Sequence, residues 1–458
     1  MVYRLPEKRI LALLIAIFPI QLIDSKFGTL NTFLTYVIAF AFILQGRMKS
    51  APLLWSVFCL FLAYAISFSF SHPDARIWHI LYLIGFAANF LLFYLIYNFI
   101  SRTGDYEAIV TGLFLANVLV VIACLIEIVL GDKQVMLFGL KEWTLGSPRA
   151  NQGRIVGPLG STHTTADYLV AQCMLVAYWI LLKASPSGQR RLMLLLGLNL
   201  VCLVATGDRG GFIGCLLGSV VFVWLFRRDI GGMGVAKYSV VGTMMFVLAS
   251  FAVVEYTDFG RLYERLANTE VTVEDHPREI GFRRGTEWFR ESPIVGIGPR
   301  LNVSTRSVQI GDITYRGAQP HNLYLTILAS TGVIGMIAWL VFFFSAMVPI
   351  AKATRRASLA DRGLSELPKL ALLVVFLFLM GEVRIEFLRE DYFDYQNYIF
   401  VLLALFVACA HIILQRAGVA ALDGGSARRR RSLLAESAGV QRTQENEVSR
   451  TNSIQTRS

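Results

Sequence analysis

Charged residues are scarce in this chain of 458 residues. They make up 16% of the sequence, whereas hydrophobic residues make up 55%. Soluble domains carry about 25% charged residues, so a string of soluble domains is excluded. Intrinsic disorder is excluded for most of the chain, because so apolar a sequence can bury enough surface to offset the entropy lost on folding. We therefore expect a polytopic membrane protein.

Several motifs of soluble enzymes are also missing. The six cysteines form no CxxC and no short metal-binding spacing, and each lies in an apolar run, where a free thiol behaves as a small hydrophobic side chain. The chain lacks GxxxxGK[ST], HExxH and a nucleophile elbow. Nucleotide hydrolysis, zinc-dependent hydrolysis and catalysis by a nucleophilic serine therefore lack support. We expect no metal and no cofactor.

Twelve apolar segments are candidates for transmembrane helices, each of which takes about 20 residues. Their approximate limits are 10–23, 29–45, 52–70, 77–100, 108–130, 166–183, 190–206, 211–227, 235–254, 320–350, 368–383 and 397–415. With the N-terminus inside, the excess of Lys and Arg falls on the cytoplasmic side, as the positive-inside rule requires. We expect an all-α fold of about 12 transmembrane helices over residues 1–415, with both termini cytoplasmic. Topology thus explains the basic charge, and no nucleic-acid binding is expected.

Two outer loops, 131–165 and 255–319, are far longer than the others. The second, between spans nine and ten, contains nine arginines and no lysine. Arginine binds phosphate with a planar fork, although ion pairs with the ten acidic residues of the same loop are an equally acceptable explanation. We expect this large loop to fold over the membrane, and we expect residues 416–458 to be a disordered cytoplasmic tail.

The segment Thr206–Gly211 (TGDRGG) joins two spans at the outer face. Glycines then recur every four residues along the second span, at Gly210, Gly214 and Gly218. This spacing allows another helix to approach closely. Arg209 lies at the start of that span, where a guanidinium and the free amides of a helix N-terminus both attract an anion. The alternatives are a salt bridge to Asp208 or an interfacial anchor.

The segment Pro320–Leu325 (PHNLYL) opens the tenth span, where the long loop returns to the membrane. Proline is favoured in the first helical turn, so we expect the helix to include Pro320. His321 would then lie at the positive helix end, which favours the neutral imidazole that can accept a proton. A lone histidine at a helix start is, however, more often a structural hydrogen-bonding residue.

Together these segments resemble the O-antigen ligase and O-antigen polymerase superfamily of bacterial envelope glycan transferases. The hallmark of that family is His followed by Asn, Ser or Gln, then nine residues, then Gly-x-x-Gly, Thr or Tyr. The matching residues are His321, Asn322, Gly332 and Gly335. The family's Arg-x-x-x-Trp and Pro-x-x-Gly-x-Gly patterns resemble 284–288 and 293–298, and Arg209 in its short turn also fits. Residues 154–160 are similar to a further family segment, but Thr162-His163-Thr164 replaces the usual Pro-Asn and gives no support to a role for His163.

The resemblance implies a metal-independent, inverting transfer of a glycan from undecaprenyl pyrophosphate to an acceptor hydroxyl, at the periplasmic face of a bacterial inner membrane. Arg209 and Arg284 would hold the pyrophosphate and stabilise its growing negative charge. His321 would take the proton from the acceptor hydroxyl or orient it. The further substrate-binding residues that we expect are Arg154, Asn322, Trp288, Arg300 and Arg316.

Two reactions within the family stay open. A ligase transfers the glycan to a lipid A core sugar, and a polymerase transfers it to another lipid-linked glycan. No residue separates them, and we prefer the ligase only because the family is commonly described so. A small-anion transporter is the alternative of another class. It predicts an ionisable group at mid-depth in the membrane, whereas Glu127, the residue clearly within a span, lies near the outer end.

Overall fold

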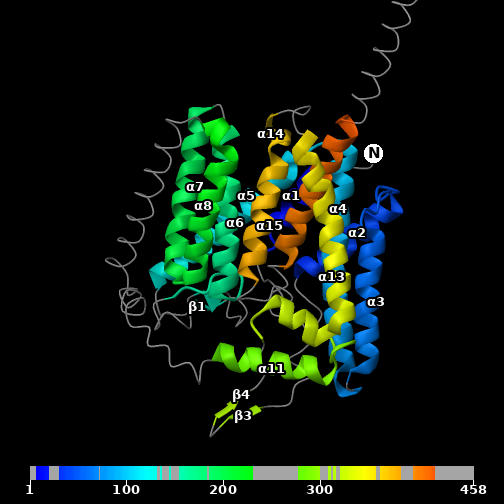
Figure 1. The fold of residues 1–458 in the computed structure, drawn as a ribbon. Coiled ribbons are helices and arrows are strands. Elements are labelled where there is room, and N and C mark those ends of the chain that lie inside the picture. Colours follow the sequence, from blue (N-terminus) through cyan, green and yellow to red (C-terminus); the bar gives the residue numbers. More distant parts are fainter. Residues whose placement is uncertain are drawn as a thin grey trace, which may run out of the picture.

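The computed structural model shows a bundle of helices with parts of its connecting loops (Figure 1). The described residues are 7–19, 30–71, 73–130, 135–136, 144–145, 154–182, 185–230, 277–299, 308–310, 313–315, 320–356, 362–382 and 396–417. The predicted ninth span 235–254, much of the loop 255–319 and nearly all of the tail 416–458 lie outside the described residues.

Helices make up most of the described chain, which confirms the all-α class. They are α1 (Glu7–Ala16), α2 (Leu30–Leu44), α3 (Leu54–Phe70), α4 (Arg76–Thr103), α5 (Glu107–Leu130), α6 (Thr162–Leu182), α7 (Pro186–Thr206), α8 (Arg209–Ile230), α11 (Pro277–Glu291), α13 (Leu323–Arg356), α14 (Arg362–Ser365), α15 (Leu367–Gly381) and a C-terminal helix, Gln396–Ala417. The loops add two antiparallel hairpins. These are β1 (Val135–Met136) with β2 (Thr144–Leu145), and β3 (Val308–Ile310) with β4 (Ile313–Tyr315).

Eight helices in the described part of the chain are long and apolar enough to cross a membrane. They are α4 to α8, α13, α15 and the C-terminal helix. The apolar helices α2 and α3 are shorter, with 15 and 17 residues, and α1 has only 10. Every predicted span except 235–254 therefore coincides with a helix, whereas the total of twelve stays a prediction.

Aromatic rings fill the middle of the bundle. Phe86 on α4 is fully buried, and its ring centroid lies 5.5 Å from that of Tyr64 on α3, 6.0 Å from Trp339 on α13 and 6.1 Å from Phe400 on the C-terminal helix. These contacts join helices that are far apart in sequence. Large apolar side chains are also exposed on the outside, such as Trp55 at 79%. Lipid tails are as apolar as the core, so such exposure fits a membrane environment.

The cysteines behave largely as small core side chains. All six are free, and all except Cys59 are buried. The sequence-based interpretation is therefore confirmed for five of them and is wrong for Cys59, which is exposed.

Helices α6 and α8 approach each other along a glycine face of α8. A Cβ added at Gly211 would lie 2.9 Å from the Cβ of Ala166 on α6, and one at Gly218 would lie 2.9 Å from a side-chain carbon of α15. The predicted close helix approach is therefore confirmed. Gly211, which the predicted four-residue spacing did not include, belongs to the same packed face.

Helix α13 is interrupted at Gly332, which has φ 65° and ψ −165°. Just after the break, two backbone N–H groups donate to carbonyls of the loop 293–298, and just before it two carbonyls accept from N–H groups of the same loop. The donor–acceptor pairs are Val333–Pro293 at 2.9 Å, Ile334–Ile294 at 3.2 Å, Ile297–Ala329 at 3.0 Å and Gly298–Ser330 at 3.1 Å. The loop thus satisfies backbone groups that an unbroken helix would satisfy itself. The predicted span 320–350 is therefore a helix that this loop interrupts at Gly332.

Two more glycines leave room for this junction. A Cβ at Gly296 would lie 2.3 Å from the backbone of Ser330, and a Cβ at Gly335 would lie 1.8 Å from Oγ1 of Thr331. Neither position can hold a larger residue without movement of the chain. The glycines that carried the sequence resemblance therefore have a structural function here.

The break divides α13 into two parts. The part before Gly332 lies beside α11 at one end of the bundle, called the α11 end below (Figure 1). The part after it, Val333–Arg356, rises about 36 Å at ~1.5 Å per residue, which is enough to cross a bilayer alone.

We expect Gly332→Ala to destabilise the protein more than Gly46→Ala. The two glycines have nearly the same φ, 65° and 64°, but ψ of −165° places Gly332 in a region that is essentially restricted to glycine, so alanine is strained there. Only at Gly332 does the new Cβ also meet backbone, 2.2 Å from the carbonyl oxygen of Ile294, whereas nothing lies within 4 Å at Gly46. Thermal unfolding in detergent should show an extra loss of roughly 2 kcal/mol for Gly332→Ala. Equal losses would contradict the packed junction.

Candidate functional site

The candidate residues lie at the α11 end of the bundle, where α6, α8 and α13 begin and α15 ends. The first backbone N–H of α13 donates to the carbonyl of Glu382, just after α15, at 2.9 Å. A Cβ at Gly381 would lie 2.9 Å from Oδ2 of Asp167, so α15 also touches α6. Helix α6 contacts the glycine face of α8. Through these contacts the structure brings Arg209, at the start of α8, and His321, just before α13, to neighbouring helix ends.

A buried carboxylate holds the segment 154–160. Glu127, near the end of α5, is only 7% exposed, and its Oε2 accepts backbone hydrogen bonds from Val156 and Gly157, both at 3.0 Å. Thr165 on α6 donates its hydroxyl to the carbonyl of Val156 at 2.7 Å. The charge of Glu127 thus stabilises a loop, which is a structural function and gives the transporter alternative no support.

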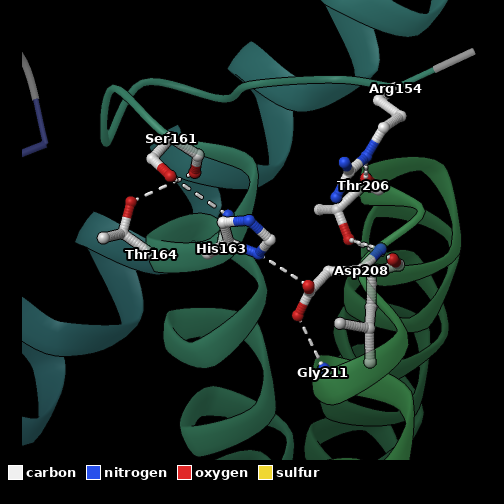
Figure 2. A network of polar contacts seen from close by, with 8 residues as sticks. Arg154, Ser161, His163, Thr164, Thr206, Asp208 and Gly211 are labelled. Carbon is white, nitrogen blue, oxygen red and sulfur yellow. Dashed lines mark hydrogen bonds and ion pairs between the residues drawn. The ribbon is translucent and has the colours of Figure 1, made fainter. Parts of the chain in front are cut away.

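Arg154 lies over the turn between α7 and α8 (Figure 2). Its Nε donates to the carbonyl of Thr206 at 3.0 Å, and the backbone N–H of Ile155 donates to the carbonyl of Ala205 at 3.0 Å. These bonds satisfy carbonyls that the end of α7 leaves without a helical partner. Arg154 is thereby fixed against the turn that carries Arg209. The two sequence segments that resemble the family, 154–160 and the turn with Arg209, are therefore in direct contact.

Asp208 caps α8. Its Oδ2 accepts the backbone N–H of Gly211 at 2.7 Å, which is the usual geometry of an N-cap. Its Oδ1 lies 2.7 Å from Nδ1 of His163, in the first turn of α6. Asp208 is 3% exposed, so one buried carboxylate joins the starts of two helices (Figure 2).

Arg209 is the first residue of α8, and its side chain is exposed. The predicted position at a helix start is therefore confirmed. The positive end of the helix dipole and the first backbone amides lie here, and together with the guanidinium they favour a bound anion.

An apolar groove begins beside Arg209 and runs along the bundle between α6, α8, α15 and the C-terminal helix. Asp167, Gly210 and Gly381 line it near the α11 end. Aliphatic and aromatic side chains line the rest, among them Ile213, Leu217, Val374, Leu377 and Phe378. The groove thus leads from the hydrophobic part of the bundle to the start of α8.

His321 lies just before α13. The helix begins at Leu323, because Asn322 is a favourable N-cap and its Oδ1 accepts the N–H of Leu325 at 3.0 Å. The prediction that Pro320 belongs to the first helical turn was wrong. His321 has φ 51°, a left-handed conformation that costs a residue with a Cβ about 1–2 kcal/mol. Strained residues of this kind concentrate at active sites.

Arg284 and Trp288 both lie on α11. The guanidinium carbon of Arg284 is 6.0 Å from the ring centroid of Trp288, and its Nη1 donates to Glu287 at 2.9 Å. Trp288 is buried. Between the two, a Cβ at Gly285 would lie 2.7 Å from Pro320, so α11 packs directly on the residue before His321. Arg284 therefore lies on a helix that packs beside His321. Its ion pair with Glu287 is of the kind that the sequence analysis gave as the alternative to phosphate binding.

Residues 192–340 match the family model described as O-antigen ligase. The matched region runs from α7 through α8 and α11 to the broken helix α13. It includes Arg209, Arg284 and His321. Within these residues the chain is similar to O-antigen ligases. The resemblance found in the sequence is thereby confirmed, while no curated protein matches the chain.

The O-antigen ligase match and the eight apolar helices together support a multi-pass membrane glycan transferase of the ligase or polymerase type. The segment with Glu127 and Arg154 precedes the matched region but packs directly on it through Thr206. The candidate site therefore combines residues from inside and outside the matched region.

Some residues of the candidate site escaped the sequence analysis, and two predicted ones are not described. Arg300 and Arg316 lie outside the described residues. Asp208, His163 and the fully buried Glu382 received no function from the sequence. The N-cap function of Asp208 was readable, because an Asp directly before a helix start is a capping signal. Its contact with His163 was not, since the two residues come from different helices.

Proposed function

We propose that this protein transfers a glycan from undecaprenyl pyrophosphate to an acceptor hydroxyl at the periplasmic face of the inner membrane, as an O-antigen ligase with lipid A core as acceptor. The observation that carries the proposal is the apolar groove that ends at Gly210, beside Arg209. A groove of this kind fits a donor with a long hydrocarbon chain and an anionic head. The O-antigen ligase match supplies the class of reaction.

Arg209 would hold the diphosphate of the donor. Its guanidinium can bind phosphate with two parallel hydrogen bonds, and the first amides of α8 add further donors. Negative charge on the diphosphate grows as its bond to the sugar breaks. Fixed positive groups therefore stabilise the transition state more than the bound donor, which is what accelerates the reaction.

His321 would serve the acceptor. The acceptor oxygen forms a bond to the anomeric carbon from the face opposite the diphosphate, and the bond between that carbon and the diphosphate oxygen breaks. The lipid diphosphate leaves with the bonding electrons, and the hydroxyl proton passes to His321. This displacement inverts the anomeric centre. Because guanidinium groups balance the charge of the leaving group, the proposal assigns no metal ion.

Arg284 is the second candidate for the diphosphate. It lies on α11, which packs on Pro320 next to His321. Its present partner Glu287 has a side chain that is 43% exposed, and such ion pairs contribute little stability. A diphosphate could therefore replace Glu287 at small free-energy cost.

A polymerase that joins lipid-linked glycans is the alternative within the family. Reconstitution in liposomes with a lipid-linked glycan donor distinguishes the possibilities. Transfer to lipid A core supports the ligase, and transfer to a second lipid-linked glycan supports the polymerase. Flux of a small anion without any transfer would support a transporter instead.

In that assay we expect Arg209→Ala to lower the transfer rate by roughly 100-fold, because a fixed cation at a growing negative charge is lost. Arg209→Lys should restore only part of the rate, since an ammonium replaces the planar fork. Arg227→Ala, at the other end of α8, is the matched control and should retain full activity. Full rescue by lysine would argue against bidentate phosphate binding.

His321→Asn separates chemistry from backbone strain. Asparagine tolerates the left-handed conformation that His321 adopts at φ 51°. The variant should therefore fold like the wild type, with an unchanged Tm, but lose roughly 100-fold or more in transfer rate because no proton acceptor remains. A variant with wild-type rates would remove His321 from the reaction.

A further inference from the structure

The contact between His163 and Asp208 lies next to the proposed donor site and has no function in the reaction described above. His163 is the second residue of α6, and its backbone N–H donates to the Oγ of Ser161 at 3.2 Å. Its ring nitrogen Nδ1 is 2.7 Å from Oδ1 of Asp208, while its side chain keeps 22% of its surface exposed (Figure 2). The imidazole is therefore fixed in place and still accessible.

The position of this pair points to the diphosphate. Asp208 directly precedes Arg209, the start of α8. His163 is one helical turn before Asp167, which lines the apolar groove near the α11 end, as Gly210 does. The imidazole thus lies at the same end of the groove as the guanidinium, on the helix that faces α8.

The chemistry of the pair fixes which nitrogen carries a proton. A carboxylate is only a hydrogen-bond acceptor, so Nδ1 has to donate to Asp208. A phosphate oxygen is also only an acceptor. If Nε2 binds a phosphate oxygen, it must carry a second proton, and the ring becomes a cation. Binding of the diphosphate would then take up one proton.

We propose that His163 contacts the donor diphosphate through Nε2, and that Asp208 is a positioning residue which holds the imidazole for this contact. This inference rests on the proposed function, because it takes the donor to lie at Arg209. It adds a second positive group to the guanidinium of Arg209. Because binding takes up one proton, donor affinity should fall as the pH rises.

The charged groups of the neighbouring elements are Asp208, the N-cap of α8, Arg209, the first residue of α8, Arg154 from the loop before α6, Asp167 from α6 itself and Glu382 after α15. The arginines stay charged at both pH values of the test, and the variants below separate the contribution of His163 from that of the carboxylates.

The test is a binding titration of the full-length protein in detergent. The probe is farnesyl diphosphate joined through its second phosphate to N-acetylglucosamine. The corresponding farnesyl glycoside without phosphate serves as control ligand. Each phosphorus of this diphosphate carries one strongly acidic proton, so the probe itself does not titrate near neutral pH. We expect the wild type to bind the probe about tenfold more weakly at pH 8 than at pH 5.5. The control ligand should show no such change.

Two variants test separately the contact of His163 with the diphosphate and the positioning of His163 by Asp208. His163→Gln should bind the probe about tenfold more weakly than the wild type at pH 5.5 and show no pH dependence.

In Asp208→Asn the amide oxygen still caps Gly211, while its NH₂ group donates to Nδ1 of His163 and so shifts the ring proton to Nε2. Neutral His163 then already presents a donor to the phosphate. We expect this variant to keep its affinity at pH 8 and to lose most of the pH dependence.

The outcomes separate this inference from the proposed function. If Arg209→Ala weakens probe binding while the wild type and His163→Gln show the same affinities at both pH values, His163 is only a structural partner of Asp208 and the inference is wrong. If Arg209→Ala also binds normally, the donor site itself is misplaced. A transfer rate that rises with pH, with probe affinity unchanged, would make His163 a base and would also overturn the proposal.

Discussion

Inside a lipid bilayer every backbone N–H and C=O has to be hydrogen-bonded by the protein itself, and irregular backbone is tolerated only where other parts of the chain satisfy it. The break in α13 meets this requirement through the loop 293–298, which exchanges four backbone hydrogen bonds with the helix around Gly332. The segment 154–160 meets it through the carboxylate of Glu127. Both irregular segments lie at the α11 end, and they position the residues of the proposed site.

This constraint also explains which part of the site is rigid. Helix α11 packs through Gly285 on Pro320, and the loop that follows it is fixed to both sides of the break. His321 therefore occupies a short strained segment between two packed elements. A residue held in this way keeps its geometry when substrate binds, which favours catalysis by preorganised groups.

Buried carboxylates support the cations of the site. Asp208 caps the helix that begins with Arg209 and holds His163, and Glu127 fixes the loop that carries Arg154. The negative groups lie inside the bundle, and Arg209 is exposed at its end. An anion that approaches from outside therefore meets positive groups first. The same arrangement leaves the groove beside Gly210 apolar over most of its length.

Helix positions could be predicted from the sequence, since runs of apolar residues mark α4 to α8 almost to their observed ends. The break in α13 could not be predicted, because its cause is a loop more than thirty residues earlier in the chain, and Gly332 alone is compatible with a continuous helix. The start of α13 was readable from Asn322, but proline was given more weight than the cap. The positions of Arg209 and His321 came from family motifs and local helix signals. The contact of His163 with Asp208 depends on how α6 and α8 pack, which no local pattern contains.

The central claim is that the donor lipid lies in the groove between α6, α8 and α15 with its diphosphate at Arg209. Photoaffinity labelling tests it directly, with a glycan diphosphate whose prenyl chain carries a diazirine. The account predicts labelled peptides from the first half of α8 and the second half of α15, around Leu217 and Phe378, with labelling reduced in Arg209→Ala. Labelling spread over exposed faces such as that of α3, and unchanged by Arg209→Ala, would contradict it.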